Sequence, residues 1–306
     1  MVSLPPSVRI RGRFAPSPTG ILHLGNLRTA LASWLSVRAR GGEWILRMED
    51  VDTTRSRREL GEAQIRDLVA LGMESDGPVL WQSERGDCYR EALDSLDRKG
   101  LLYPCDCSRK DLALLAGAPH EGDGLRPYPG RCRAKAAREG RAMRFLLPPG
   151  RVLWQDLLLG SQSDEPEHLT GDPLLFRRDG CYAYHLAVVV DDGEQGVTEV
   201  VRGADLRAVT ATQIRLQEAL GLRRPDYAHL GLVTSSDGSR LGKRDGGLGL
   251  AALAERGISP GELLGWLGWS LGCLEAPEPC LATDLVHAFA WDRVPHGPIA
   301  IPSSWE

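Results

Sequence analysis

The sequence of 306 residues contains no apolar run that approaches the length needed to span a membrane. Such a span takes about 20 consecutive apolar residues. The opening residues also lack the apolar core of a secretory signal peptide, and the sequence shows neither an internal repeat nor a low-complexity tract. We therefore expect a cytoplasmic protein without a membrane partner. With 42% apolar and 25% charged residues, the composition is that of a globular protein with ample core.

The sequence also has no overall excess of positive charge, since its formal net charge is −4. Contact with a nucleic acid would therefore need a local basic patch. Residues 126–144 provide one, with a single acidic residue, Glu139. Its basic residues are Arg126, Arg131, Arg133, Lys135, Arg138, Arg141 and Arg144. The segment indicates a surface for an RNA backbone, and a solvated helix face is the alternative.

The cysteines are odd in number and unevenly distributed along the sequence. The count of seven is odd, and three of them cluster as Cys105, Cys107 and Cys132. Without a secretory signal, such clustering favours a metal over disulfides, and three thiolates suit a structural zinc ion with four ligands. Zinc chemistry alone prefers His120 or water as the fourth ligand, although Tyr128 also lies close in sequence. The alternative is three buried thiols without metal. The other four are expected to be buried structural residues: Cys88, Cys181, Cys273 and Cys280.

The most informative stretch is 13–26, RFAPSPTGILHLGN. An apolar run leads into a turn rich in Pro and Gly, and leucines from Leu24 onward follow a helical spacing. A strand, a turn and a helix in this order direct backbone N–H groups and the helix dipole at an anion. His23, Gly25 and Asn26 lie where that anion would bind, which predicts a contact with phosphate. A turn with an incidental histidine is the alternative.

The remaining pattern predicts an α/β protein of the Rossmann type, with a doubly wound parallel sheet. Strands are expected at 43–48, 186–190, 197–201 and 227–233, and helices at 27–40, 57–72, 86–100 and 210–220. A small β-rich insertion is expected over 152–180, and helices near 251–257, 260–272 and 282–289. Several of the strands end in polar residues, which lie where ligands bind in such sheets.

A carboxylate substrate calls for a buried guanidinium, because a bidentate Arg–carboxylate pair selects charge and shape together. Arg13 and Arg202 both lie at expected strand ends. Glu49 could hold an α-ammonium group, and Tyr184 could add a hydroxyl. These four residues predict a dicarboxylic amino acid as substrate, with glutamate or aspartate both compatible with the charges.

Residues 240–244 (RLGKR) form a second basic stretch of the kind that grips pyrophosphate. Together, HLGN and this lysine loop resemble the HIGH and KMSKS signatures of class I aminoacyl-tRNA synthetases, and RFAPSPTG resembles the glutamyl and glutaminyl branch. WILRMEDVD, YAYHLAVVVDD and VTEVVRGADL extend the resemblance through Arg244. Only about sixty residues follow, and the cysteines read Cys-x-Cys and then Tyr-x-x-x-Cys. Both features resemble the glutamyl-queuosine tRNA(Asp) synthetase family.

That resemblance implies ATP-dependent activation of L-glutamate without tRNA, with Mg²⁺ accompanying ATP, and transfer of the glutamate to queuosine in the anticodon of tRNA(Asp). It implies glutamate binding by Arg13, Phe14, Ala15, Pro16, Ser17, Glu49, Tyr184 and Arg202. It implies ATP binding by His23, Gly25, Asn26 and Lys243, with His23, Asn26 and Lys243 acting in catalysis. It also replaces His120 by Tyr128 in the zinc site, giving Cys105, Cys107, Tyr128 and Cys132 as ligands of one structural Zn²⁺.

The expected organisation is a first half of the Rossmann domain (1–100), an inserted zinc-binding, acceptor-like subdomain (101–175), a second half with the lysine loop (176–245) and a helical region without an anticodon-binding domain (246–306). We expect a monomer. Four positions depart from the family pattern: Arg240, Gly242, Arg244 and His185. Gly242 removes a phosphate hydrogen bond and loosens the loop. Three alternatives are a shortened glutamyl-tRNA synthetase charging a 3′ end, a non-catalytic tRNA-binding paralogue, and a nucleotidyltransferase for another acid.

Overall fold

The structure is a computed structural model that describes residues 9–107, 127–134, 142–239 and 248–306. Its strands are β1 (Arg11–Phe14), β2 (Glu43–Met48), β3 (Leu80–Trp81), β4 (Leu102–Cys105), β5 (Ala142–Phe145), β6 (Val152–Asp156), β7 (Gly160–Asp164), β8 (Leu174–Phe176), β9 (Glu199–Gly203), β10 (Asp226–Leu230), β11 (Val233–Thr234) and β12 (Ile299–Ala300). Its α-helices are α1 (Leu24–Arg38), α2 (Arg58–Ala70), α3 (Gly86–Arg98), α5 (Pro166–Leu169), α6 (Tyr184–Glu194), α7 (Thr210–Leu220), α8 (Leu250–Glu255) and α9 (Pro260–Ser270). Short 3₁₀ helices are η1 (Gln82–Glu84), η2 (Ala204–Val209), η4 (Ala282–Ala288), η5 (Trp291–Arg293) and η6 (Ser303–Trp305).

The main sheet has seven strands in the order β3-β2-β1-β9-β10-β6-β7. All neighbours pair in parallel except β6 and β7, which form an antiparallel hairpin at one edge. The chain therefore starts in the middle of the sheet, runs outward on one side, and returns to the other side of β1 at β9. This reversal confirms the expected α/β fold with a mostly parallel sheet, and ligands bind at such a switch point in doubly wound folds.

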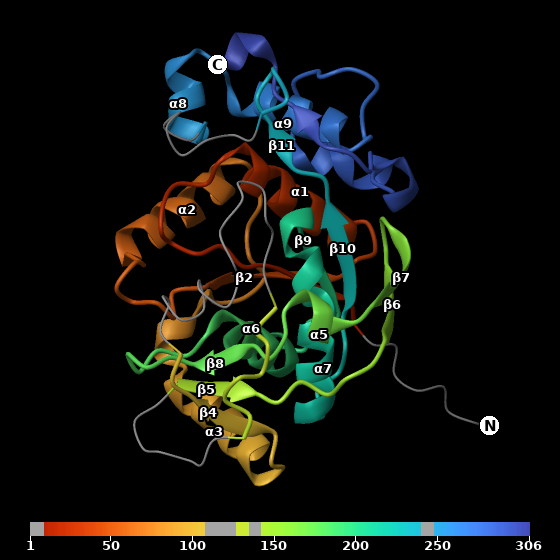
Figure 1. The fold of residues 1–306 in the computed structure, drawn as a ribbon. Helices are drawn as coiled ribbons and strands as arrows, with labels where there is room; N and C mark the ends of the chain where they lie inside the picture. The colour runs from red at the N-terminus through yellow and green to blue at the C-terminus, as the bar shows by residue number, and fades with distance from the viewer. Residues whose placement is uncertain (1–8, 108–126, 135–141, 240–247) are drawn as a thin grey trace, which may run out of the picture.

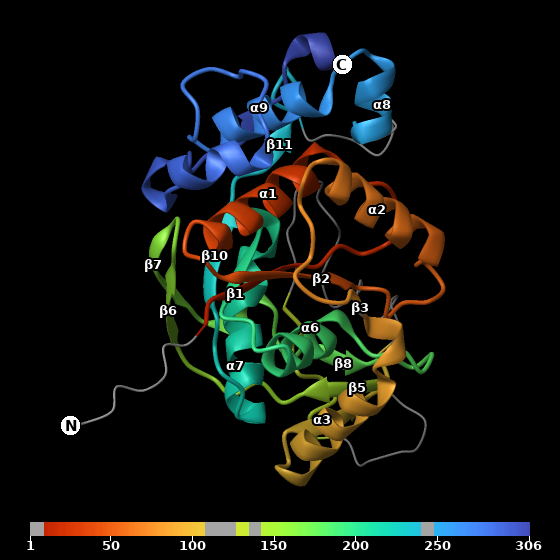
Figure 2. The same ribbon diagram turned by 180° about the vertical axis from the view of Figure 1, so that it is seen from behind.

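Helices cover both faces of this sheet (Figures 1 and 2). α1 and α2 lie on one face, and the C-terminal elements pack beyond α1; α6 and α7 lie on the other face with α3 beside them. Because α1 has the sheet on one side and the C-terminal elements on the other, most of its residues are buried, with Leu24, Leu27, Leu31 and Leu35 fully so. None of the described helices is long and apolar enough to cross a membrane.

Two sequence-based expectations differ from the structure. The apolar run 186–190, expected as a buried strand, lies in α6. A helix enclosed on all sides shows the same unbroken apolar run as a buried strand, and α6 packs against α3, α7 and β8. The region 152–180 is not a separate insertion either, since β6 pairs in parallel with β10 and extends the main sheet.

A second, three-stranded antiparallel sheet has the order β4-β5-β8. It lies beside α3 and α6, away from the C-terminal elements (Figure 1). A small buried cluster of Tyr103, Cys105, Tyr128 and Cys132 packs next to it. This arrangement brings the three cysteines of the sequence cluster together although Cys105 and Cys132 are far apart in the chain.

Candidate active site and thiol cluster

The turn after β1 leads into α1, as the sequence predicts, and His23 is the N-cap of this helix. Its Nδ1 accepts hydrogen bonds from the backbone N–H groups of Gly25 (3.1 Å) and Asn26 (3.4 Å). The Asn26 side chain in turn accepts from the backbone N–H of His23 at 3.2 Å. These reciprocal bonds form a capping box, which satisfies N–H groups that the first turn of a helix leaves unpaired. The structure thus gives His23 and Asn26 a role in starting α1.

Gly25 is required by this cap. A Cβ atom placed on Gly25 would lie 3.0 Å from Cε1 and 3.1 Å from Nδ1 of His23. A side chain here would push the imidazole away from the backbone that it caps. The exposed imidazole therefore stays at the mouth of the turn, on the first turn of α1, where a helix N-terminus favours anions.

Arg13, at the end of β1, is buried and bonds to a buried carboxylate on α6. Its Nε donates to Oδ1 of Asp192 at 3.3 Å, and Nη2 of the fully buried Arg47 donates to the same oxygen at 2.7 Å. Burial would raise the pKa of Asp192, but Arg47 and Arg13 outweigh it and lower that pKa. Asp192 is therefore ionised and fixes both guanidinium groups.

Glu49 lies directly after β2, beside the loop that contains Pro16. Its backbone N–H donates to the carbonyl of Pro16 at 2.9 Å, which joins the two expected parts of the site. The Glu49 carboxylate lies 3.8 Å from Nη2 of Arg47, and its side chain is only 10% exposed. Burial raises its pKa to about 7, against the opposing attraction of Arg47 and Arg13. A cationic ligand such as an ammonium group would stabilise the ionised form of a carboxylate whose pKa is raised in this way.

Tyr184, at the start of α6, lies within the electrostatic reach of the other three predicted residues. Burial raises the pKa of its phenol; the charge of Glu49 adds to this, and Arg202 and Arg13 oppose it. The structure thus brings Arg13, Glu49, Tyr184 and Arg202 into one region. The neighbouring His185 is half-buried, and burial with the nearby Arg202 lowers its pKa to about 4, so it is neutral at pH 7.

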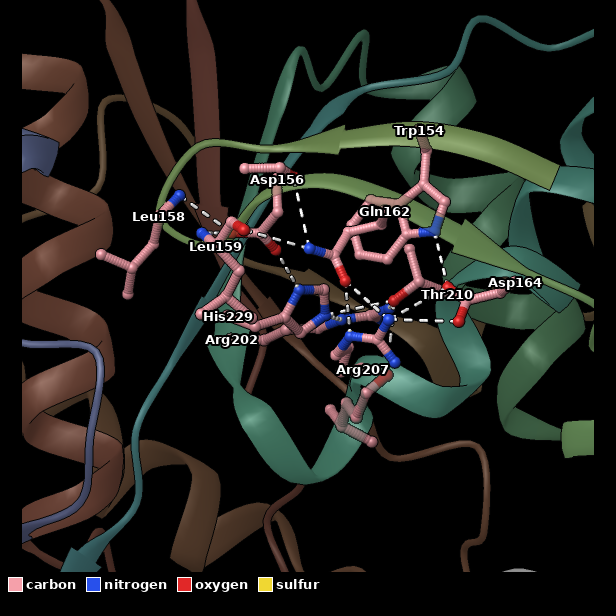
Figure 3. Close-up of polar contacts among 12 residues, drawn as sticks. Trp154, Asp156, Leu158, Leu159, Gln162, Asp164, Arg202, Arg207, Thr210 and His229 are labelled. Atoms are coloured by element: carbon pink, nitrogen blue, oxygen red, sulfur yellow. Dashed lines mark hydrogen bonds and ion pairs between the residues drawn. The ribbon is translucent and has the colours of Figure 1, made fainter.

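Arg202, on β9, is also buried and is held by three side chains, of which Figure 3 labels Thr210 and His229. Its Nη1 donates to Oε1 of Gln213 at 2.7 Å, its Nη2 to Oγ1 of Thr210 at 2.8 Å, and its Nε to Nε2 of His229 at 3.1 Å. The guanidinium has five N–H groups, so the bonds to these described residues account for three of them and leave two for a ligand. Two N–H groups in a fixed plane suit one carboxylate.

The thiol cluster has the dimensions of a tetrahedral metal site. The sulfur atoms of Cys105, Cys107 and Cys132 all lie within 4.8 Å of one another, and Cys107 and Cys132 are 3.7 Å apart. The Tyr128 hydroxyl lies 3.6 Å from the sulfur of Cys105 and 3.8 Å from that of Cys107. Bonds of about 2.3 Å to sulfur in a tetrahedron place the sulfur atoms about 3.8 Å apart. The donor set therefore fits Zn²⁺, and His120 lies outside the described residues.

Arg144, on β5, supports this cluster from two sides. Its Nε donates to the sulfur of Cys105 at 3.2 Å, and its guanidinium carbon lies 3.7 Å from the centre of the Tyr128 ring. The same side chain donates to the carbonyl of Asp172, whose carboxylate accepts two bonds of 2.7 Å from Arg133. A guanidinium that donates to the Cys105 sulfur would help to hold and orient that ligand beside a bound metal ion.

Parts of the basic segment therefore serve the fold. Arg133 and Arg144, expected on an RNA surface, are committed to Asp172 and Cys105. Four other basic residues of the segment lie outside the described residues: Arg126, Lys135, Arg138 and Arg141. The lysine loop also lies outside them, with Arg240, Gly242, Lys243 and Arg244. The described structure places no side chain of that loop relative to the site.

Residues 9–267 match the family model described as tRNA synthetases class I (E and Q), catalytic domain. Glutamyl-Q tRNA(Asp) synthetase of Symbiobacterium thermophilum is 44% identical over 95% of this chain and 96% of its own. The protein of the same name from Nitratidesulfovibrio vulgaris is 42% identical over 96% of each chain. The chain belongs to the glutamyl-Q tRNA(Asp) synthetase family. It is therefore a ligase of the class I aminoacyl-tRNA synthetase type.

Solved structures agree with this membership. A crystal structure of glutamate-tRNA synthetase from Elizabethkingia anophelis superposes with a TM-score of 0.83 at 28% sequence identity. The superposition covers 97% of this chain and 69% of that one. A glutamate tRNA ligase from Elizabethkingia meningosepticum, solved with its amino acid, gives the same TM-score. The family's fold thus spans nearly the whole of this chain.

The sequence analysis missed several residues that hold the predicted ones in place. Asp192 accepts from both Arg47 and Arg13, and His229 and Asp156 lie behind Arg202. A signal was present for one of these residues, Asp192, because the charged pair Asp191-Asp192 follows an apolar run. His229 lies within an apolar stretch and gave no signal of its own.

Proposed function

We propose that the protein activates L-glutamate with ATP, forming glutamyl-adenylate without tRNA, and transfers the glutamate to queuosine in the anticodon of tRNA(Asp). Family membership supports the reaction class. The observation that carries the choice of amino acid is the convergence of Glu49 and Tyr184 with the buried Arg13 and Arg202 in one region. Two arginines and one carboxylate there complement the two carboxylates and one ammonium group of glutamate.

In this proposal, the two N–H groups of Arg202 that remain available and the Arg13 guanidinium bind the carboxylates of glutamate. Glu49 binds the ammonium group, and the tyrosine hydroxyl orients the amino acid. The mouth of the β1–α1 turn, with His23, Gly25 and Asn26, receives the phosphates of ATP. Catalysis consists mostly of holding two anions close together and neutralising the charge that grows on the leaving pyrophosphate. Mg²⁺ bound to ATP supplies part of that neutralisation, and Lys243 of the lysine loop supplies the rest.

We further propose a structural Zn²⁺ held by Cys105, Cys107, Tyr128 and Cys132, in an inserted segment over residues 101–175 whose strands β6 and β7 join the main sheet. The spacing of the sulfur atoms and the position of Arg144 support this ion. The remaining divisions are those expected from the sequence: 1–100 and 176–245 as the two halves of the catalytic domain, and 246–306 as a C-terminal region. The protein is proposed to act as a cytoplasmic monomer.

Transfer of labelled glutamate tests the function. The full chain is incubated with ATP, Mg²⁺ and labelled glutamate, and with tRNA(Asp) that either carries queuosine or lacks it. The 3′ end of each tRNA is oxidised by periodate in a parallel sample. We expect label that needs queuosine and survives oxidation of the 3′ end.

Other outcomes identify the competing functions. Label on tRNA(Glu) that is lost on oxidation would show a synthetase that charges a 3′ end. Absence of glutamate-dependent pyrophosphate exchange would contradict activation altogether and favour a tRNA-binding paralogue without turnover. Exchange with aspartate in place of glutamate would show a different acid substrate.

A further inference from the structure

A chain of buried side chains runs from Arg202 to the hairpin of β6 and β7 (Figure 3). Behind Arg202, on β10, lies the fully buried His229, whose Nε2 accepts from Arg202 Nε at 3.1 Å. The other ring nitrogen, Nδ1, lies 2.6 Å from Oδ2 of Asp156 at the end of β6. Asp156 is buried as well, so both contacts form away from water.

The carboxylate decides which ring nitrogen of His229 carries the proton. Oδ1 of Asp156 accepts backbone N–H groups from Leu158 and Leu159, both at 2.9 Å, which leaves Oδ2 for the imidazole. An ionised carboxylate only accepts, so Nδ1 must carry a hydrogen. Burial lowers the pKa of His229 although the bond to Asp156 opposes this, so the ring is neutral at pH 7. Nε2 therefore presents a lone pair, the group that the Arg202 N–H needs.

Thr210 closes the arrangement. Its hydroxyl oxygen accepts from Arg202 Nη2 at 2.8 Å and lies 3.1 Å from Nε2 of His229. The Thr210 hydroxyl hydrogen can point to the carbonyl of Leu206 at 3.5 Å while its oxygen accepts from Arg202, which leaves the single lone pair of Nε2 to the Arg202 Nε–H. With a hydrogen on Nε2, the Arg202 Nε–H would face another donor at 3.1 Å. The plane of the guanidinium thus depends on the tautomer of His229.

We propose that Asp156 and His229 are positioning residues that fix the Arg202 guanidinium for the carboxylate of the amino acid, through the tautomer that Asp156 imposes on His229. This inference rests on the proposed role of Arg202 in binding glutamate. Neither residue touches the substrate. Their effect is on the affinity for the amino acid, and the ATP site lies elsewhere, at the start of α1.

The variant Asp156→Asn tests the tautomer directly. The N–H groups of Leu158 and Leu159 still require an acceptor, so the amide oxygen takes the place of Oδ1 and the amide NH₂ faces His229. Nδ1 must then accept, and the ring proton moves to Nε2. We expect the KM for glutamate to rise about tenfold, the cost of one buried donor without a partner. The KM for ATP should stay within about twofold, because no bond to the nucleotide changes.

Asp164→Asn is the matched control. Asp164 is a buried carboxylate on the adjacent strand β7, near Arg202 and His229 (Figure 3). The described residues that donate to its carboxylate are Trp154 and Arg207. Its replacement removes an equal charge from the same hairpin without changing the tautomer of His229. The KM for glutamate should then stay near that of the wild type. Melting curves of both variants separate loss of folding from loss of affinity.

Two further measurements make the explanation specific. The ¹⁵N shifts of the His229 ring identify the protonated nitrogen, and we expect Nδ1–H in the wild type and Nε2–H in Asp156→Asn. The double variant Asp156→Asn/His229→Gln places an amide carbonyl near the former Nε2, where it can accept from Arg202 in either case. It should recover most of the lost affinity.

An unchanged ring proton in Asp156→Asn, or an unchanged KM for glutamate in a folded variant, would overturn the inference. Equal loss of affinity in Asp164→Asn would overturn it too, since a general effect of the hairpin would then explain the result. Failure of the proposed function looks different, because the wild type itself would show no pyrophosphate exchange with glutamate. Pyrophosphate exchange by the wild type is therefore measured in every series.

Discussion

The buried charges at the ends of β1 and β2 illustrate, at the scale of residues, how a proposed binding site can oppose stability. Arg13, Arg47, Glu49 and Asp192 form a group in which two cations face two carboxylates. Asp192 has both arginines as direct partners, whereas Glu49 lies 3.8 Å from Arg47 and its pKa is raised to about 7. Because Glu49 has the weaker partners, the free-energy cost of burying a charge falls mainly on this residue, which we propose to bind the ammonium group.

Glu49→Gln should therefore stabilise the free protein and weaken glutamate binding. The carboxyl ionises near pH 4.5 when unfolded and near pH 7 when folded, so stability falls as pH rises through that window. The loss at pH 8 is on the order of 3 kcal/mol, and the neutral amide avoids it. Calorimetry should show a higher melting temperature for the variant than for the wild type at pH 8. At pH 4.5 the two melting temperatures should differ little.

The same residue gives a pH dependence to substrate affinity. Only the ionised carboxylate attracts an ammonium group, so the KM for glutamate should rise as pH falls from 8 to 6 in the wild type. In Glu49→Gln the KM should be higher and nearly independent of pH over this range. A pH dependence that survives in the variant would assign the titration to another group.

Cys132→Ser tests the proposed zinc site. Loss of one thiolate removes a ligand, so bound zinc in the purified protein should fall well below one ion per chain and the melting temperature should drop. Metal content is measured by mass spectrometry after dialysis. Cys181→Ser is the control, because Cys181 is a half-buried thiol outside the cluster, and it should keep its zinc. Equal zinc content in the two variants would argue against the site.

At the scale of elements, the start of α1 combines two tasks in one side chain. His23 caps the helix through Nδ1, and the same imidazole lies where ATP phosphates are proposed to bind. Asparagine is as good an N-cap as any residue, whereas alanine is a poor one. The two substitutions therefore separate the structural task from the chemical one.

His23→Ala should lose about 1 kcal/mol of unfolding free energy and most of the activity. His23→Asn should unfold like the wild type and still lose a large part of the pyrophosphate exchange rate, about a hundredfold if the imidazole stabilises charge in the transition state. Urea unfolding and exchange assays on both variants check this. An active His23→Asn would show that the cap alone matters.

The elements also show where sequence reasoning succeeds. The bounds of β2 and α7 and the residues at the β1–α1 turn follow from local patterns, and so does the meeting of Cys105 with Cys107. The prediction of a strand at 186–190 was wrong, because an enclosed helix such as α6 and a buried strand show the same apolar run. His229 and Asp156 escaped notice because their bond joins residues 73 positions apart. Such pairs are decided by the three-dimensional packing of strands, and no local pattern encodes them.

At the scale of the whole molecule, the C-terminal region is part of the same core as the sheet. The core around α1 includes residues from Phe14 to Ile301. Arg28, on α1, is fully buried, and donates to both the hydroxyl and the carbonyl of Ser270 on α9 and to the carbonyl of Gly231. One side chain thus joins α1 to the end of β10 and to the C-terminal helices.

Arg28→Met should destabilise the whole protein by about 3 kcal/mol, because two buried carbonyl groups lose their charged donor. Urea denaturation should still show a single transition, since the C-terminal elements share the core with α1. Arg38→Met is the control on the same helix. Its bridge to Asp76 is partly exposed, and its loss should cost less than 1 kcal/mol. Separate unfolding of residues 248–306 would contradict the single core.

The central position of β1 also sets an order of events during synthesis. β1 is bonded on one side to β9, and Arg11 bonds to Thr198, 187 residues later in the chain. At 5–20 residues per second, a ribosome takes about 10–40 s to deliver this partner. Throughout that time the first strand lacks one neighbour, and the core around Phe14 and α1 is incomplete. We therefore expect nascent chains of this protein to bind the chaperones that meet polypeptides at the ribosomal exit.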